Sequence, residues 1–276
     1  MRYHILIIGV ALLSWCAAIS PARAFDEAKF PQLKGQWSRI GDARWDTTRP
    51  RLAQQAPLTP QYQRFLQASI DEQHAGGHGN DLMYKCFPPG MPRMMLAYNP
   101  IEFIITPDVT YIALEHMTQF RRVYTDGRAW PQSLKPSFVG TSIGKWIDED
   151  GDGRYDALVI ETRGMRGPRA FDSSGLPLHD DNETIVEERI HLDPTDSDLL
   201  HNEITTIDHA LSRPWTVVRS YKREQHPGWV EHICGEDNRH VEIGKENYFI
   251  SLDGFLMPTR KDQTPPQLRG FDQAQR

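Results

Sequence analysis

The stretch that decides the fold is Ile143–Arg163, IGKWIDEDGDGRYDALVIETR. Apolar residues dominate both of its ends, and an acidic segment that contains glycine separates them. Short apolar runs on either side of an Asp and Gly cluster are typical of a β-hairpin. Four aspartates stand at positions 1, 3, 5 and 9 of the turn, with Gly153 at position 6: Asp148, Asp150, Asp152 and Asp156. The sequence therefore predicts a hairpin whose turn carries regularly spaced carboxylates.

This spacing predicts a calcium site that stabilises the hairpin. Calcium takes about six to eight oxygen ligands, and alternate carboxylates around a sharp Gly turn direct oxygens to one point. The backbone carbonyl of Arg154, at position 7, would add a ligand. The turn is not an EF-hand, because Val159 replaces the Glu of position 12; it resembles the shorter DxDxDGxxD loops between strands of calcium-dependent extracellular proteins. The alternative is an acidic turn that binds no ion, because Asp and Gly are common turn residues.

The first 24 residues, MRYHILIIGVALLSWCAAISPARA, predict a secretory signal peptide that is cut after Ala24. Its apolar run is too short for a membrane span, so we expect no integral membrane association. Removing Arg2 and Arg23 from the 31 basic residues leaves 29 against 37 acidic residues, a formal charge of −8. No basic cluster suggests nucleic acid as a partner. The expected location is the periplasm or the outside of the cell.

Two cysteines remain after the predicted signal peptide, Cys86 and Cys234. In an oxidising compartment an isolated pair predicts a disulfide. The alternative is two separate buried thiols.

The pattern along the chain predicts a mainly β protein with one helix. Residues 25–100 are expected to be irregular apart from a helix over 58–75, in which Thr59 is the N-cap and Pro60 the first helical residue. Gly35-Gln36-Trp37 begins a segment that could pair as a first strand. Residues 101–260 are expected to form an antiparallel β-barrel of roughly nine or ten strands, of which Trp229–Cys234 is one. Residues 261–276 are expected to be an extended tail.

Several runs from Gly140 onward, GTSIGKW, LVIETRG, GLPLHDDNETIVEERIHLD and HNEITTIDHALSRPWTVV, resemble a family of secreted bacterial proteins with VET, VER and RPWT strand motifs. CFPPGMPRMM and RRVYTDGR upstream and CGEDNRHVEIG downstream fit the same pattern. The resemblance covers most of the chain after residue 24 and implies a calycin-like, lipocalin-type barrel. It implies no activity. Many relatives have a short turn in place of DEDGDGRYD, so calcium would be a property of this branch.

Three glutamates share a strand face with apolar residues, because side chains alternate along a strand: Glu161, Glu188 and Glu203. A carboxylate that points into a core must be paired, hydrogen-bonded or protonated. One interpretation is a set of buried Glu–Arg pairs that fix the strand register. The other is the polar floor of a ligand cavity, where the glutamates act as acid or base and Arg213 orients the ligand. The apolar wall of that cavity would then come from Tyr124, Trp130, Trp215 and Tyr221.

Metal catalysis is a further alternative. His201 with Glu203, Asp208 with His209, and the loop histidines His74 and His78 offer ligands for zinc or iron, but no complete ligand set is evident.

The leading functional hypothesis is a calcium-stabilised β-barrel that binds a small apolar or aromatic molecule. The second is a hydratase, isomerase, lyase or hydrolase on the same barrel that needs no redox cofactor. The third is a structural or interaction protein of the cell envelope.

Overall fold

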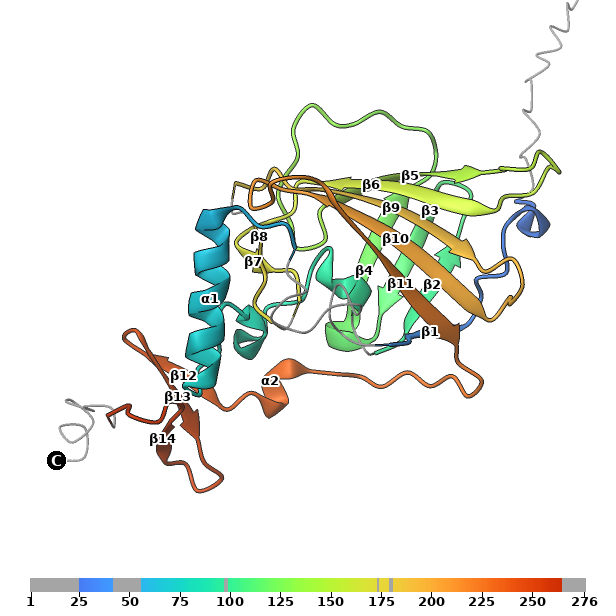
Figure 1. Ribbon diagram of the computed structural model, residues 1–276. Coiled ribbons are helices and arrows are strands. Elements are labelled where there is room, and N and C mark those ends of the chain that lie inside the picture. Colours follow the sequence, from blue (N-terminus) through green and yellow to red (C-terminus); the bar gives the residue numbers. More distant parts are fainter. Residues whose placement is uncertain (1–24, 42–55, 97–98, 173, 179–180, 265–276) are drawn as a thin grey trace, which may run out of the picture.

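The computed structural model describes residues 25–41, 56–96, 99–172, 174–178 and 181–264. This part of the chain is mainly β, and nine strands close into a barrel (Figure 1). The barrel strands are β1 (Gln36–Arg39), β2 (Ile101–Ile105), β3 (Val109–Leu114), β4 (Gln119–Tyr124), β5 (Thr141–Ile147), β6 (Ala157–Arg163), β9 (Ile185–Leu192), β10 (Leu199–Ile207) and β11 (Trp215–Arg223). Their order is β1-β11-β10-β9-β6-β5-β4-β3-β2, and β1 pairs with both β11 and β2. The predicted β-barrel with little helix is confirmed.

The barrel strands pair antiparallel with one exception. β4 and β5 pair in parallel, with Val123 opposite Ser142 and Tyr124 opposite Ile143. A parallel pair cannot be joined by a tight turn and needs a crossover connection. Residues 125–140 make this connection, and Figure 1 shows them arching over the outside of the barrel beside β5 and β6. The crossover therefore places a long segment against the outer wall.

The predicted hairpin is confirmed. β5 and β6 pair along their whole length, from Thr141 opposite Arg163 to Ile147 opposite Ala157. The turn between them contains Gly151 and Gly153 at φ +79° and +88°. Glycine adopts this left-handed region without the steric cost that a Cβ would add. The two glycines thus let the acidic segment fold back over a short distance.

The inside of the barrel combines an apolar core with a polar centre. Alternate residues of each strand point inward, as the two-residue period of a strand requires. Apolar residues that are at most 1% exposed include Trp37, Ile112, Val123, Leu158, Val186, Ile190, Leu200, Ile204 and Tyr221. Buried polar residues from five neighbouring strands lie among them: Arg121, Ser142, Thr162, Glu188 and Asn202.

The predicted helix is α1 (Pro60–His74), which lies against one end of the barrel (Figure 1). It begins at Pro60 with Thr59 at the N-cap, as expected, although the Thr59 side chain makes no capping hydrogen bond. Ser69 of this helix is buried and accepts a hydrogen bond from the backbone of Asn80 at 2.9 Å. A Cβ at Gly175 would lie 2.2 Å from the Ser69 hydroxyl, so only glycine permits this close approach.

The remaining described elements are short. They are η1 (Glu27–Lys29), η2 (Leu82–Lys85), η3 (Arg93–Leu96), η4 (His116–Thr118), β7 (Arg169–Ala170), β8 (Pro177–Leu178), α2 (Cys234–Asp237), β12 (His240–Ile243), β13 (Glu246–Ile250) and β14 (Leu256–Pro258). β7 pairs with β8, and β12, β13 and β14 form a separate three-stranded sheet.

These elements correct the predicted boundaries. The possible first strand after Gly35 is β1 of the barrel, which therefore begins before residue 101, and the barrel ends at Arg223 rather than at residue 260. Trp229–Cys234 is not a strand: Trp229, Val230 and Ile233 are 39%, 66% and 50% exposed, so no sheet partner covers their apolar side chains. The predicted signal peptide and the tail after residue 264 lie outside the described residues.

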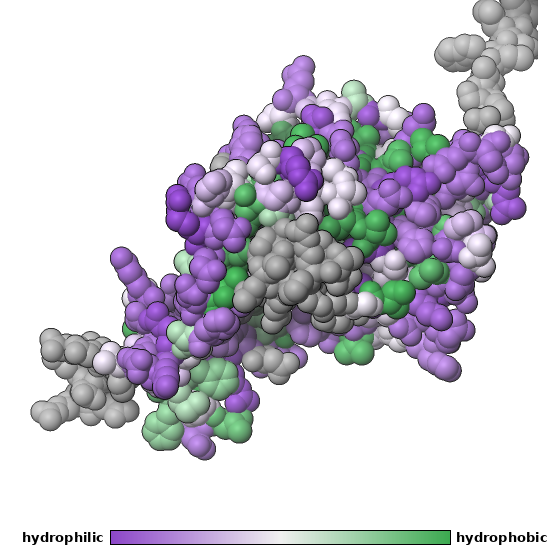
Figure 2. Space-filling view, in the orientation of Figure 1, coloured by the Kyte–Doolittle hydropathy of each residue, from purple (hydrophilic) through white to green (hydrophobic). Residues whose placement is uncertain are grey.

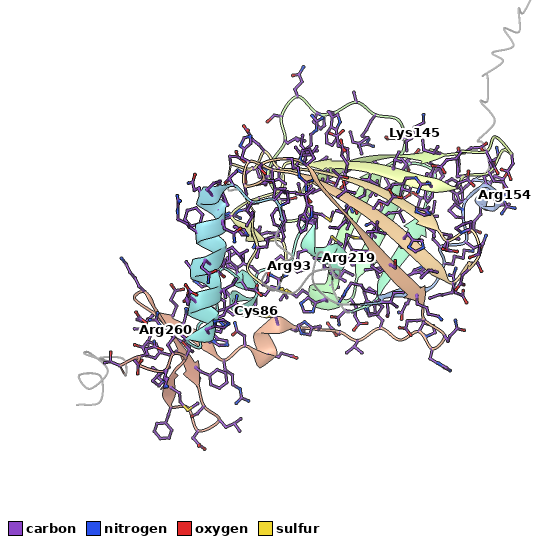
Figure 3. All side chains as sticks on the ribbon, viewed as in Figure 1. Cys86, Arg93, Lys145, Arg154, Arg219 and Arg260 are labelled. Carbon is purple, nitrogen blue, oxygen red and sulfur yellow. A yellow bond between two sulfur atoms is a disulfide. The ribbon has the colours of Figure 1, made fainter. Side chains whose placement is uncertain are left out.

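A disulfide joins Cys86 to Cys234, with the two Cα atoms 5.6 Å apart, as the sequence predicted. It connects the segment after η2 to α2, so it fastens the C-terminal elements to the end of the barrel near α1 (Figure 3). The C-terminal sheet carries exposed apolar side chains, among them Leu252 (84% exposed) and Phe255 (70%). Figure 2 shows this sheet as a greener area than the hydrophilic β5–β6 hairpin on the opposite side.

Candidate functional site

A groove of about 890 Å³ lies on the outer wall of the barrel. The crossover segment, from Thr125 to Trp130, forms one side of it, and β5, β6, β9 and β10 form its floor. Phe30 and Tyr155 line it as well, close to the turn of the acidic hairpin. We call this feature the outer-wall groove. It exists because the parallel β4–β5 pair requires a long connection outside the barrel.

The strand register arranges the floor of the outer-wall groove in two neighbouring rows of outward-pointing side chains. One row contains Lys145, Val159, Arg189 and Glu203. The next contains Ile143, Glu161, Glu187 and Thr205. Each of these residues lines the groove. The floor therefore presents charges of both signs on a rigid sheet.

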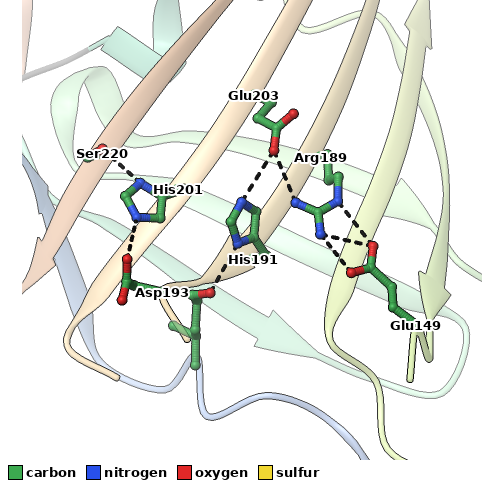
Figure 4. Close-up of polar contacts among 8 residues, drawn as sticks. Glu149, Arg189, His191, Asp193, His201, Glu203 and Ser220 are labelled. Carbon is green, nitrogen blue, oxygen red and sulfur yellow. Dashed lines mark hydrogen bonds and ion pairs between the residues drawn. The ribbon is translucent and has the colours of Figure 1, made fainter. Parts of the chain in front are cut away.

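Arg189 is the centre of a charged network on this floor (Figure 4). Its guanidinium donates to the Glu149 carboxylate at 2.8 and 2.9 Å and to Glu203 Oε1 at 3.0 Å. Glu203 also lies 3.4 Å from His191 Nε2. Burial lowers the pKa of Arg189, but the bonds to Glu149, with Glu203 adding to them, raise it above its ordinary value overall. These contacts hold the floor charges in fixed positions.

Cation–π contacts hold the aromatic side chains at the edge of the groove. The Arg163 guanidinium lies 4.8 Å from the Trp130 ring and pairs with Glu161. The Arg128 guanidinium lies 3.8 Å from the Tyr124 ring. Such contacts fix the orientation of a ring that would otherwise rotate in solvent.

Arg128 also perturbs its acidic neighbour in the crossover segment. Its side-chain hydrogen bonds lower the pKa of Asp126 to about 2. Asp126 is therefore a carboxylate at any physiological pH, and Arg128 remains paired beside the groove.

The far end of the outer-wall groove is an aromatic cluster beside the acidic hairpin. The Phe30 ring lies 5.0 Å from Tyr155 and 5.3 Å from Trp146, measured between ring centroids. The backbone N–H of Tyr155 donates to the carbonyl of Lys29 at 2.7 Å. The N-terminal segment and the hairpin thus meet at this end of the groove.

The inside of the barrel contains a separate polar network around Glu188. Arg121 donates to Glu188 Oε2 at 2.5 Å, and Asn202 donates to Glu188 Oε1 at 2.9 Å. Arg121 also donates to Ser142 and Thr162, at 3.0 and 2.7 Å. The side chains of Arg121 and Glu188 are 1% and 0% exposed. This is the buried Glu–Arg pair that one interpretation of the sequence predicted.

The structure separates the three predicted glutamates. Glu188 points into the barrel, whereas Glu161 and Glu203 point outward into the groove. The prediction that they form the floor of a single barrel cavity is wrong, because the alternation of a strand shows which residues share a face but not which face is inside. Arg213 is exposed, and among the described residues its side chain donates to the carbonyl of Pro214 and to no carboxylate, so it orients neither set of glutamates.

The four predicted aromatic residues are separated in the same way. Trp215 and Tyr221 are buried inside the barrel, at 8% and 1% exposed. Tyr221 donates its hydroxyl to the carbonyl of Met95 at 2.6 Å, and burial, with the charge of Glu188, raises its pKa. Tyr124 and Trp130 lie outside, beside the groove. The single apolar wall predicted from these residues is therefore wrong.

The acidic turn brings three of its four aspartates together. Carboxylate oxygens of Asp148, Asp150 and Asp156 lie within 4.8 Å of one another. The turn orders itself with its own backbone: Gly151 and Gly153 donate to the Asp148 carboxylate at 2.7 and 2.9 Å.

Asp152 stands apart from this group, and its carboxylate accepts a hydrogen bond from the backbone of Arg154 at 2.7 Å. Three converging carboxylates match the hard oxygen donors that calcium prefers.

Among the described residues, the histidines contact groups other than the partners with which they were predicted to bind a metal. His201 lies 2.9 Å from Ser220 Oγ through Nδ1 and 3.2 Å from Asp193 Oδ2 through Nε2, so both of its nitrogens are engaged (Figure 4). Glu203 meets Arg189 and His191 instead, so the predicted pair of ligands does not converge.

The side chains of Asp208 and His209 also point to different partners and do not form the predicted pair of metal ligands. Asp208 is buried and accepts hydrogen bonds from Thr184 and from the backbone of Ala210. His209 is exposed and forms a group with Asp181 and Glu183, whose ligand atoms lie within 4.8 Å of one another. Of the two loop histidines, His74 is exposed, and His78 lies 3.2 Å from a ring nitrogen of His240.

Sequence reasoning missed the partners that define each network. The sequence indicated buried Glu–Arg pairs, but it did not indicate that Arg121 is the partner of Glu188 or that Asn202 donates to the same carboxylate. The only signal for Asn202 was its place two residues from Ile204, on the inward face of β10. Lys145, Glu187 and Arg189 also line the groove, and no local pattern distinguishes them from ordinary surface charges.

No protein-family model matches the chain, and no curated protein sequence matches it. The family resemblance inferred from the strand motifs therefore stays a prediction. The helices of the described residues are too short or too polar to span a membrane.

Proposed function

We propose that the protein binds a small molecule with an aromatic or apolar body in the outer-wall groove, in the periplasm or outside the cell. The size of the groove carries the proposal. Small-molecule sites occupy about 300–1,000 Å³ and combine apolar or aromatic walls with a few fixed polar groups. The groove, at about 890 Å³, falls within this range. The Cys86–Cys234 disulfide supports an oxidising compartment.

The lining of the groove supports a ligand with both apolar and polar parts. Trp130, Phe30 and Tyr155 offer aromatic surface near its two ends. Arg189 and Glu203 are held by ion pairs, so they lose little freedom when a polar ligand group meets them. Groups that are fixed before binding reduce the entropic cost of association.

Calcium has a structural role in this proposal. Asp148, Asp150 and Asp156 would hold the ion and pin the β5–β6 turn. Tyr155 lies beside Asp156 in sequence and lines the groove. Calcium would therefore stabilise one end of the binding site without taking part in any reaction.

The test is a titration of the mature protein with a panel of small aromatic and apolar metabolites. Binding is measured by the melting temperature and by tryptophan fluorescence. A ligand of the groove raises the melting temperature in a saturable way. Trp130→Ala is expected to weaken this ligand by about tenfold or more, which corresponds to about 1.4 kcal/mol. Trp229→Ala is the matched control, because Trp229 is 39% exposed and lies outside the groove. A cooperatively melting protein that responds to no compound would reject the proposal.

A second candidate function is catalysis without a redox cofactor. The observation that favours it is the presence of three carboxylates, Glu161, Glu187 and Glu203, in one groove. Carboxylates at different distances from a bound molecule can divide the roles of acid and base in a hydratase, isomerase, lyase or hydrolase. Glu203→Gln and Glu161→Gln distinguish the two functions. If the protein is an enzyme, the variants lose turnover and keep ligand affinity. If it is a binding protein, the wild type itself shows no turnover.

A further inference from the structure

Two arginines near the end of the barrel, Arg166 and Arg169, form no ion pair with any of the described residues. Arg169 belongs to β7, and Arg166 lies three residues before it. The backbone N–H of Arg166 donates to the carbonyl of Ser137 at 2.8 Å, which fixes this segment beside the end of the crossover segment. The two side chains meet Phe138 of that segment.

The contacts of these arginines are aromatic. The Arg169 guanidinium lies 4.0 Å from the Phe138 ring centroid and 5.4 Å from that of Phe87. The Arg166 guanidinium lies 5.8 Å from the same Phe138 ring. The two phenylalanine rings meet edge to face at 6.0 Å. Both cations therefore share one ring, although like charges repel one another at short range.

Several other arginines of the described residues are neutralised by carboxylates. Arg93 donates to both carboxylate oxygens of Asp81, at 2.7 and 2.8 Å, and Arg121 pairs with Glu188 inside the barrel. Within the described residues, neither Arg166 nor Arg169 has an ion pair or a side-chain hydrogen bond, and the Nε of Arg169 is buried without a partner. The described residues thus supply no carboxylate that pairs with the positive charge at this place.

The environment of Arg169 reflects this imbalance. Burial, followed by the charges of Arg166 and Arg93, lowers its pKa to about 10. No carboxylate contributes in the opposite direction. A half-buried cation next to other cations is costly unless an anion compensates it.

We propose that Arg166 and Arg169 form a binding site for an oxyanion group, a phosphate or a carboxylate, with Phe87 and Phe138 packing against the body of the ligand. A guanidinium presents a planar fork of donors that matches the oxygens of both groups. Phe87 is 36% exposed, so part of its ring is available to a ligand. The site is separate from the outer-wall groove, none of whose lining residues belongs to it.

The experiment is calorimetric titration of the full mature protein with inorganic phosphate and with benzoate, each at constant ionic strength maintained with sodium chloride. We expect saturable binding of one of them, and the tighter one identifies the class of oxyanion. Arg169→Gln is expected to weaken this binding by about tenfold or more, and Arg169→Lys by less, because lysine keeps the charge but loses the fork.

Arg122→Gln is the matched control. Arg122 is exposed on β4, and its guanidinium lies 5.8 Å from the Tyr111 ring, so it is also an arginine beside an aromatic ring. Its replacement should leave oxyanion binding unchanged. Arg166→Gln is the second variant if Arg169 variants fail to fold, because Arg166 is exposed and its replacement disturbs the fold less. Heat changes equal to those of sodium chloride, or an equal loss in Arg122→Gln, would overturn the proposal.

Discussion

Arg121 and Glu188 form an ion pair in the centre of the barrel, with Nη2 and Oε2 2.5 Å apart and with 1% and 0% of the two side chains exposed. They come from β4 and β9, which are not neighbours in the barrel, so the pair spans its interior. Asn202 donates to the second oxygen of Glu188, and Ser142 and Thr162 accept from Arg121. The pair is therefore both desolvated and almost completely hydrogen-bonded.

We expect Glu188→Gln to destabilise the protein by about 3–5 kcal/mol, because it leaves the Arg121 charge buried without an anion. Chemical denaturation of the variant and the wild type measures this difference. The double variant Arg121→Met with Glu188→Leu is expected to recover most of the loss, because it removes both charges. A single variant within about 0.5 kcal/mol of the wild type would contradict a buried ionic centre.

Calcium is expected to raise the melting temperature, and EDTA to lower it, if the acidic turn binds the ion. At about 100 times the dissociation constant the stabilisation is about 2.7 kcal/mol. Asp150→Ala should abolish the calcium response, because this carboxylate belongs to the converging group. Asp196→Ala is the control, since Asp196 belongs to another acidic turn. Identical melting curves with calcium and with EDTA would show that the turn binds no ion.

The disulfide is expected to stabilise the protein substantially. Cys86 and Cys234 are 148 residues apart, and the chain-entropy model gives about 5 kcal/mol for a loop of this length, which is an upper estimate. The variant Cys86→Ser with Cys234→Ser should therefore unfold at a clearly lower denaturant concentration. Reductant should shift the wild type in the same direction and leave the variant unchanged. A wild type insensitive to complete reduction would contradict this role.

Two half-buried histidines, His78 and His116, predict a loss of stability in mild acid. Burial, and then the neighbouring His240, lowers the pKa of His78, although Asp81 opposes this. Burial, followed by His232 and Arg93, lowers the pKa of His116. The folded state therefore binds these protons less readily than the unfolded state, whose histidines titrate near 6.5. Stability is at its full value above pH 6.5 and falls as the pH drops through the folded pKa values.

The measurement is denaturant unfolding at several pH values between about 8 and 5, a range in which carboxylates contribute little to the proton balance. The double variant His78→Phe with His116→Phe keeps an aromatic ring at both positions and should flatten the pH dependence. His74→Asn, at an exposed position, should not change it. A wild type with constant stability over this range would contradict the prediction.

Some features could be predicted because they depend on neighbouring residues. The apolar runs around the Asp and Gly cluster predicted β5, β6 and their turn, and Pro60 predicted the start of α1. The strand Trp229–Cys234 was wrong because its apolar residues have β propensity but no edge to pair with. Propensity describes the residue, whereas pairing depends on distant strands.

The sequence by itself determined the mainly β class, the hairpin of Ile143–Arg163 and the Cys86–Cys234 pair, because each follows from local pattern or from composition. Only the tertiary structure decided that Glu188 lies inside the barrel and that Glu161 and Glu203 line a groove outside it. The physical reason is the two-residue period of a strand: it groups residues on a face, but the closure of the sheet decides which face meets the core. The parallel β4–β5 pair, which creates the groove, is likewise a product of long-range pairing.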